Sequence, residues 1–210
     1  MSLDRFGRSP GRPNDPRSID GRIPDDLPAR LDWAPSHPTR SQAHRPLPEV
    51  TPNMATLAEL KATRGHETLS DWRVITQEMV DTYSALTGDA DPFHDDPEWS
   101  KANTPFGGTI VQGFLLLAHF TWFSRHPAGE PIDDVEYVLN YGFDKVRFVR
   151  PVPVGKPIRA RLRLLDVEDR GARAVLRFGV AIEVEGSPEP HVVAEWLGSA
   201  QKKPGAGTAR

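Results

Sequence analysis

Residues 87–94 read TGDADPFH and bring a carboxylate and an imidazole into one short segment. Asp89 directly follows Gly88, and His94 comes five residues after Asp89. Pro92 lies between them, and a proline fixes its own backbone angle and restricts the residue before it, so we expect a stiff loop. Such a loop can hold both side chains against one water molecule. Because an imidazole titrates near neutral pH, it can take a proton from that water and return it. The segment therefore predicts a site that activates water.

The same segment has two alternative interpretations. An aspartate after a helix-ending glycine is commonly a turn residue, and a histidine beside a proline is commonly a surface loop residue. A metal loop is the second alternative, because four aspartates cluster here: Asp89, Asp91, Asp95 and Asp96. A calcium loop, however, has glycine at position six and glutamate at position twelve. Counted from Asp89, those positions hold His94 and Ser100, so we expect no metal site.

A second segment, residues 107–113, reads GGTIVQG and leads into an apolar stretch. It lacks the Gly-Lys-Ser/Thr of a phosphate loop, and its plainest interpretation is a tight turn into a closely packed helix. A glycine at a helix start also leaves backbone N–H groups without partners, and these favour a developing negative charge. In outline this is an oxyanion hole. Water activation and enolate stabilisation together are what the hydration of a conjugated enoyl thioester requires.

The rest of the sequence indicates the elements that position these segments. Thr56 and Glu59 form a capping box pattern, Trp72 to Ile75 is a short strand, and Thr76 caps a helix that ends at Gly88. A helix that is apolar nearly all round, and therefore buried, is predicted from Ile110 to Ser124. Its aromatic residues Phe114, Phe120, Trp122 and Phe123 are expected to fill the core, and His119 is expected to be a hydrogen-bonded core histidine.

From Val135 onward the pattern changes to the alternation of strands. Residues 158–164 and 176–184 alternate apolar and polar side chains, and residues 191–197 make a last strand. Turns at 168–171 and 185–188 predict antiparallel hairpins. Arg159, Arg161 and Arg163 should mark the solvent face. The sequence therefore predicts the α+β class, with a long central helix wrapped by a curved antiparallel β-sheet.

The composition limits the class of protein. The chain has 210 residues and a formal net charge of -3, which argues against nucleic acid as a partner. It has no cysteine, so that cysteine chemistry is excluded and a reducing, cytoplasmic location is expected. No apolar stretch is long enough to span a membrane. Residues 1–53 hold 10 of the 21 prolines and are predicted to be a disordered extension. The domain should cover residues 54–201, followed by a disordered tail at 202–210.

Several segments, in the order in which they follow one another along the chain, resemble one known family, the MaoC-like (R)-specific enoyl-CoA hydratases and 3-hydroxyacyl-thioester dehydratases. Residues 83–94, YSALTGDADPFH, are similar to its hydratase motif, and residues 105–113, PFGGTIVQG, to its second segment. NYG at 140–142, KVRF at 145–148 and PVPVG at 151–155 resemble the NodN-like branch of the family. The resemblance runs from about Met54 to Gln201 and implies the hot-dog fold.

The resemblance also implies the roles of particular residues. Asp89 and His94 would be the catalytic pair, and the Gly113 amide would serve the oxyanion. Gln112 and Asn140 are predicted to contact the substrate with Gly113. Two positions depart from the family pattern, because Asp91 replaces an asparagine and Gln112 replaces a histidine. Gln112 can form hydrogen bonds but cannot carry a proton.

The implied function is the reversible hydration of trans-2-enoyl thioesters to (R)-3-hydroxyacyl thioesters, without a cofactor. The substrate would be an acyl-CoA or an acyl carrier protein thioester. Lys145 and Arg147 are candidates to bind the phosphates of coenzyme A. The protein would be a homodimer. Two alternatives remain. A hot-dog thioesterase usually has an acid on the central helix, which this chain lacks. A catalytically silent acyl-thioester binding subunit would not need Asp89 and His94.

Overall fold

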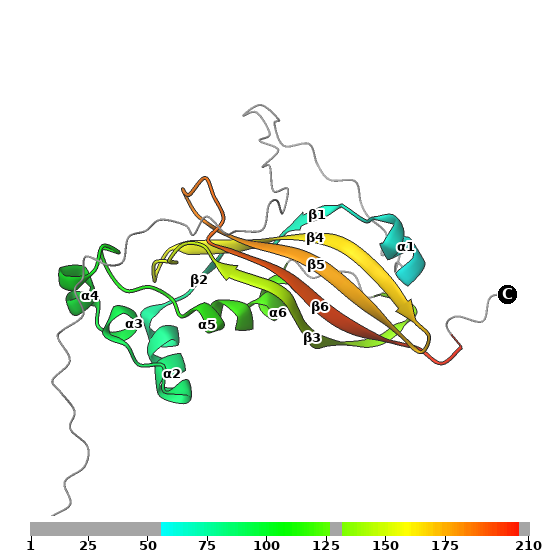
Figure 1. Cartoon of the computed structure of the whole chain (residues 1–210), viewed down its shortest axis with the longest axis horizontal. Coiled ribbons are helices and arrows are strands. Elements are labelled where there is room, and N and C mark those ends of the chain that lie inside the picture. Colours follow the sequence, from blue (N-terminus) through cyan, green and yellow to red (C-terminus); the bar gives the residue numbers. More distant parts are fainter. Residues whose placement is uncertain (1–55, 127–131, 206–210) are drawn as a thin grey trace, which may run out of the picture.

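The computed structural model describes residues 56–126 and 132–205. An antiparallel sheet dominates it, in the order β1-β4-β5-β6-β3, with β2 also paired to β4 (Figure 1). The strands are β1 (Glu67–Leu69), β2 (Arg73–Val74), β3 (Val135–Phe148), β4 (Pro157–Arg170), β5 (Arg173–Val184) and β6 (Val192–Lys202). The predicted strands and hairpins are confirmed, except that the three-residue β1 was not predicted.

Helices cover one face of this sheet and one of its ends. Figure 1 shows α5 (Gly113–Ala118) and α6 (Phe120–Phe123) along the face. The helices α2 (Gln77–Thr87), α3 (Pro92–Asp95) and α4 (Pro97–Asn103) gather at one end, and α1 (Leu57–Ala62) lies toward the other. The α+β class is confirmed. None of the helices in the two described ranges is long and apolar enough to cross a membrane.

The central helix is shorter than predicted. Residues 110–112 are extended rather than helical, because Ile110 forms a β-bridge with Pro153 and the Val111 N–H donates to the Val152 carbonyl (2.8 Å). The remaining helix is divided at His119, whose Nδ1 forms a hydrogen bond with the Leu115 carbonyl at 2.8 Å. His119 is buried, which confirms the prediction of a core histidine.

The core lies between this helix and the sheet. Phe120 and Phe123 are each 1% exposed and pack with sheet residues such as Ile158, Ile182 and Val192. Trp122 is partly buried against the same cluster. Phe114, in contrast, is 68% exposed, so the prediction that this helix is buried all round was wrong. Its first turn forms part of a cavity wall instead.

The opposite face of the sheet carries paired charges. Arg159, Arg161 and Arg163 alternate with the core residues of β4, as predicted. They are not freely solvated, because Glu183 accepts from Arg159 (2.8 Å) and from Arg161 (2.6 Å). Arg163 forms an ion pair with Glu67 of β1. The three guanidinium groups thereby share two carboxylates, which lie on the neighbouring strands β5 and β1.

The predicted domain boundaries need one adjustment. β6 continues to Lys202, one residue past the predicted domain end, and the Lys202 N–H donates to the Ala172 carbonyl at 3.0 Å. The predictions of disorder for residues 1–53 and for most of the tail fall on residues 1–55 and 206–210, which lie outside the described residues.

Two buried histidines make the stability of the fold depend on pH. Burial lowers the pKa of His119 and of His191 below the ordinary value of 6.5, and the nearby charges of Arg73 and Arg150 act in the same direction. The unfolded chain therefore binds protons more tightly than the fold does. The stability that the two neutral histidines contribute is complete above pH 6.5 and is lost as the pH falls toward their lowered pKa values.

We predict that the free energy of unfolding falls between pH 7.5 and pH 5.5, and that His191→Gln makes this fall smaller. Urea titrations at several pH values measure it. His66→Gln, which changes an exposed histidine, is the matched control and should keep the wild-type pH dependence. An unchanged slope in His191→Gln would contradict the prediction.

Candidate active site

His94 lies in the short helix α3, which closely follows α2. Gly88 caps the C-terminal end of α2, with a left-handed φ of 78° and an N–H that donates to the Ser84 carbonyl at 2.8 Å. α3 begins at Pro92, a favoured first helical residue because it needs no N–H partner there. The His94 N–H donates to the Asp91 carbonyl at 2.7 Å. The predicted stiff loop is therefore a left-handed cap followed by one proline-led turn.

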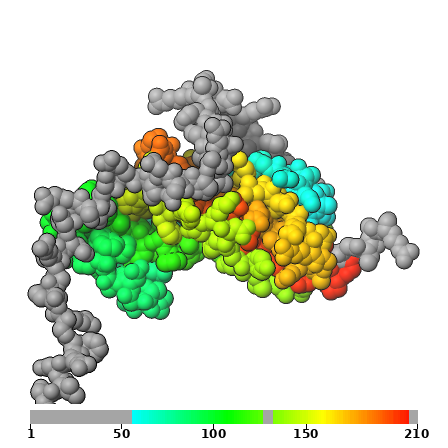
Figure 2. Space-filling view, in the orientation of Figure 1, coloured from blue at the N-terminus to red at the C-terminus, as the bar shows by residue number. Residues whose placement is uncertain are grey.

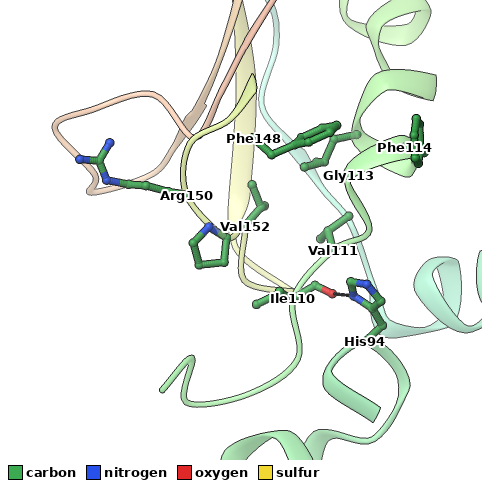
Figure 3. Close-up of a pocket in the computed structure, with 10 residues that line it drawn as sticks. His94, Ile110, Val111, Gly113, Phe114, Phe148, Arg150 and Val152 are labelled. Atoms are coloured by element: carbon green, nitrogen blue, oxygen red, sulfur yellow. Dashed lines mark hydrogen bonds between the residues drawn. The ribbon is translucent and has the colours of Figure 1, made fainter. Parts of the chain in front are cut away.

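The His94 imidazole is buried and its tautomer is determined. Its Nδ1 lies 2.6 Å from the Ile110 carbonyl oxygen (Figure 3). Since a carbonyl oxygen can only accept, Nδ1 carries the hydrogen, and neutral His94 has its lone pair on Nε2. The Ile110 N–H in turn donates to the Phe93 carbonyl at 3.0 Å. The basic nitrogen is therefore the one that does not face the backbone.

A cavity of 340 Å³ brings His94 together with the start of α5. Its walls are mostly apolar, and they include His94, Ile110, Gly113, Phe114, Phe148 and Arg150. Gly113 is the first residue of α5, where backbone N–H groups lack partners within the helix. The cavity thus brings the residue His94 together with the first residue of α5, in an apolar setting that strengthens electrostatic interactions.

Gly113 has a steric reason to be a glycine. A Cβ built at this position would lie 2.9 Å from the Cε1 and Cζ atoms of Phe148. Figure 3 shows the Phe148 ring lying against Gly113 on one side of the cavity. The missing side chain allows β3 to approach the first turn of α5. The role of the Gly113 amide stays a prediction, whereas the close approach of Gly113 and Phe148 is a feature of the structure.

Asp89 lies apart from the cavity lining. It is exposed, two residues after Thr87, the last residue of α2, and its N–H donates weakly to Thr87 Oγ1 at 3.4 Å. The carboxylate is not among the groups that line the cavity with His94. Of the other acids in the cluster, Asp96 caps α4 by accepting from the Trp99 N–H at 2.9 Å. The pairing of Asp89 with His94 therefore rests on the motif.

Gln112, predicted to contact the substrate, instead faces α2. It is fully buried, and its Nε2 donates to Ser84 Oγ at 2.9 Å and to the Val80 carbonyl at 3.3 Å. Its Oε1 has no hydrogen-bond partner within the described part of the chain. These hydrogen bonds with α2 require only a donor, and the amide supplies it without being a titratable group. Gln112 therefore links the start of α5 to α2 and does not line the cavity.

Asn140 lines a different cavity. This second space, of 300 Å³, lies beside α6 and is also lined by Thr121 and Trp196. Asn140 is thus separate from the group that His94 and Gly113 form. Of the two basic residues of β3, Lys145 pairs with Glu195 at 2.6 Å, whereas Arg147 donates to the adjacent Val146 carbonyl. Lys145 is therefore already neutralised by a carboxylate.

Two residues of the cavity were not singled out as site residues from the sequence. Phe148 forms an apolar wall, and Arg150 lies at the edge of the cavity with its guanidinium directed away from His94 (Figure 3). Arg150 pairs with Glu189 and donates to the Pro190 carbonyl at 3.3 Å. Phe148 lies in the KVRF segment, whereas Arg150 lies just before the PVPVG segment and belongs to neither.

Comparisons with known proteins identify the class to which this fold and site belong. The family model described as "MaoC like domain" matches residues 60–184. The 3-hydroxyacyl-thioester dehydratase Z of Mycobacterium tuberculosis is 42% identical over 141 residues, which cover 66% of this chain and 91% of that protein. Nodulation protein N of Rhizobium leguminosarum bv. viciae is 35% identical over 144 residues, covering 67% and 88%.

The fold has solved counterparts. The unliganded structure of the R-hydratase PhaJ1 from Pseudomonas aeruginosa matches with a TM-score of 0.55 and 22% identity, covering 70% of this chain and 86% of that one. This likeness shows the hot-dog fold, as predicted. The family match and the dehydratase relative identify the protein as an enzyme of the hydro-lyase class, also as predicted. More particularly, the chain belongs to the MaoC-like dehydratase family.

The contact between Gly113 and Phe148 yields a prediction about stability. Gly113→Ala should lower the free energy of unfolding by about 1–3 kcal/mol, because the new methyl group overpacks against the ring. In a Phe148→Ala background the same change should cost much less, which a double-mutant cycle by urea denaturation measures. Gly108→Ala is the matched control, since nothing lies within 4 Å of its Cβ position. Equal costs of Gly113→Ala in both backgrounds would refute the steric explanation.

Proposed function

We propose that this enzyme reversibly hydrates trans-2-enoyl thioesters to (R)-3-hydroxyacyl thioesters, with CoA-linked substrates. The observation that carries the proposal is the cavity shared by His94 and the first residue of α5. The Nδ1–H tautomer of His94 provides a base at Nε2. Support also comes from the relative named 3-hydroxyacyl-thioester dehydratase, which is 42% identical to this chain.

The chemistry follows from these groups. His94 Nε2, with Asp89 as its partner, takes a proton from water, and the oxygen of that water bonds to C3 of the enoyl thioester. The electron pair of the C2–C3 double bond moves toward the thioester oxygen, where the Gly113 N–H donates to the enolate. His94 then delivers that proton to C2, and the electron pair of the enolate forms the new C2–H bond. The reaction adds water without net oxidation or reduction, so we propose that it requires no cofactor.

Hydration of crotonyl-CoA tests the proposal. We expect loss of the enoyl absorbance with the wild-type protein, and Asp89→Asn and His94→Ala should each lower kcat by about 10²–10⁴-fold. Asp71→Asn and His66→Ala change an exposed residue of the same type and are the matched controls. Normal hydration in both site variants would refute the catalytic pair. Release of free thiol from a saturated acyl-CoA would favour a thioesterase, and tight binding without turnover a silent subunit.

We also propose that the enzyme is a homodimer joined along β3 and located in the cytoplasm. Among the strands of residues 56–126 and 132–205, β3 ends the sheet order and pairs with β6 on one side only. Its yellow-green residues are visible at the surface in Figure 2. It exposes several large apolar side chains: Tyr137, Val138, Leu139, Tyr141, Phe143 and Phe148. An unpaired apolar edge of 14 residues is a surface that proteins generally cover.

Light scattering coupled to gel filtration tests this dimer. We expect the wild-type protein to show twice the mass of one chain, and Leu139→Lys to shift it toward one chain, because a charge would be placed on the apolar edge. Leu86→Lys is the control, since Leu86 is also exposed, at 82%, but lies on α2. A monomeric wild type, or a Leu139→Lys variant that keeps the double mass, would argue against β3 as the interface.

A further inference from the structure

The side chain of Gln77, the first residue of α2, links three parts of the chain. Its Nε2 donates to the His94 carbonyl and to Asp81 Oδ1, both at 2.8 Å. Its Oε1 accepts from Thr109 Oγ1 at 2.5 Å. We call these hydrogen bonds the Gln77 bridge. They join α2 to α3 and to the extended segment that precedes α5.

The chemistry of the partners determines how the amide is oriented. The His94 carbonyl and the Asp81 carboxylate can only accept, whereas the Thr109 hydroxyl can donate. A reversed amide would place Oε1 against two acceptors and Nε2 against the hydroxyl. The observed orientation therefore uses both amide hydrogens and the amide oxygen, so this position requires a group with two donors and an acceptor.

The bridge holds both partners of the imidazole hydrogen bond. His94 is the residue whose ring donates, and Thr109 directly precedes Ile110, whose carbonyl accepts. Gln77 contacts the backbone carbonyl of His94 and the side chain of Thr109, the residue next to Ile110. Because His94 and Thr109 are only 8% and 6% exposed, water has little access to replace these contacts. We therefore expect a change in the bridge to alter the distance between Nδ1 and the Ile110 carbonyl.

From this geometry we propose that Gln77 is a positioning residue, which fixes the ring orientation and the Nδ1–H tautomer of His94. Its effect on turnover rests on the proposed hydratase function, whereas its effect on the tautomer does not. Gln77 is not among the residues that line the cavity, so it acts through His94 and not on the substrate. The glutamine thereby keeps Nε2 of His94 in the basic form.

Gln77→Ala tests this role. We expect kcat for crotonyl-CoA hydration to fall by about 10–100-fold while KM changes little, because a displaced ring misplaces the base without altering the cavity walls. The ¹⁵N NMR signals of neutral His94 should show Nδ1–H in the wild type and a mixture of tautomers in the variant. Asn103→Ala is the matched control, since it also removes an amide-to-carbonyl hydrogen bond (to Trp99, 2.8 Å) but lies on α4.

Two further variants test the individual contacts of the bridge. Gln77→Glu keeps the size of the side chain and can still accept from Thr109, but its carboxylate cannot donate to the His94 carbonyl. It should therefore reproduce the loss of kcat and the mixed tautomers. Thr109→Val removes the other contact, and in combination with Gln77→Ala it should add little to the single change, because both belong to one network. These variants decide the question if Gln77→Ala does not fold.

Several outcomes would overturn the proposal. A wild-type kcat with an intact Nδ1–H signal in Gln77→Ala or Gln77→Glu would show that the bridge does not position the ring. A loss of kcat that merely equals the loss of folded protein, with the tautomer retained, would assign Gln77 a structural role only. If the wild-type protein does not hydrate crotonyl-CoA, the proposed function fails, and the tautomer measurement still decides whether Gln77 positions His94.

Discussion

The hydrogen bond from His94 Nδ1 to the Ile110 carbonyl is the interaction on which the site depends. In this hydrogen bond Nδ1 donates its hydrogen, which leaves Nε2 as the basic nitrogen. The bond requires a backbone carbonyl that faces α3. That carbonyl is available because residues 110–112 are extended and pair with the segment around Pro153. Had the helix begun at Ile110, this carbonyl would have been directed along the helix axis, toward residues further along the chain. The extended conformation of residues 110–112 therefore explains both why α5 begins only at Gly113 and why the hydrogen of neutral His94 is on Nδ1.

Local chemistry made much of the fold predictable. The Thr56–Glu59 capping box, the Thr76 cap and the left-handed Gly88 all occur as expected, since each depends on neighbours within a few residues. The alternation along β4 and β5 likewise follows from burial of one face of a sheet. The hydrophobic pattern failed at Ile110 and Val111. Apolar residues suit a buried helix and a partly buried β-bridge equally well, and only the distant partner Pro153 decides between them.

The candidate site was predictable in part, for the same reason. His94 and Gly113 share a cavity, but the sequence could not show that Gln112 faces Ser84 of α2, or that Asn140 lies beside α6. Both placements depend on contacts between distant segments. The charged face of the sheet was also predictable only in part. The sequence pattern showed the arginines of β4, but it could not show that their carboxylate partners are on β1 and β5. The polar side of this sheet is therefore a network of ion pairs and is not simply hydrated.

The succession of strands has a consequence for the order of folding. β4, β5 and β6 follow one another along the chain and pair as neighbours, so each pairing closes only a short loop. The cavity instead needs His94 to meet Ile110, and Gly113 to meet Phe148 of β3, across longer stretches of chain. Contacts between distant segments form more slowly than local ones. The β4–β5–β6 part of the sheet should thus acquire its shape first, whereas the chemical centre, which also needs β3, should become native later.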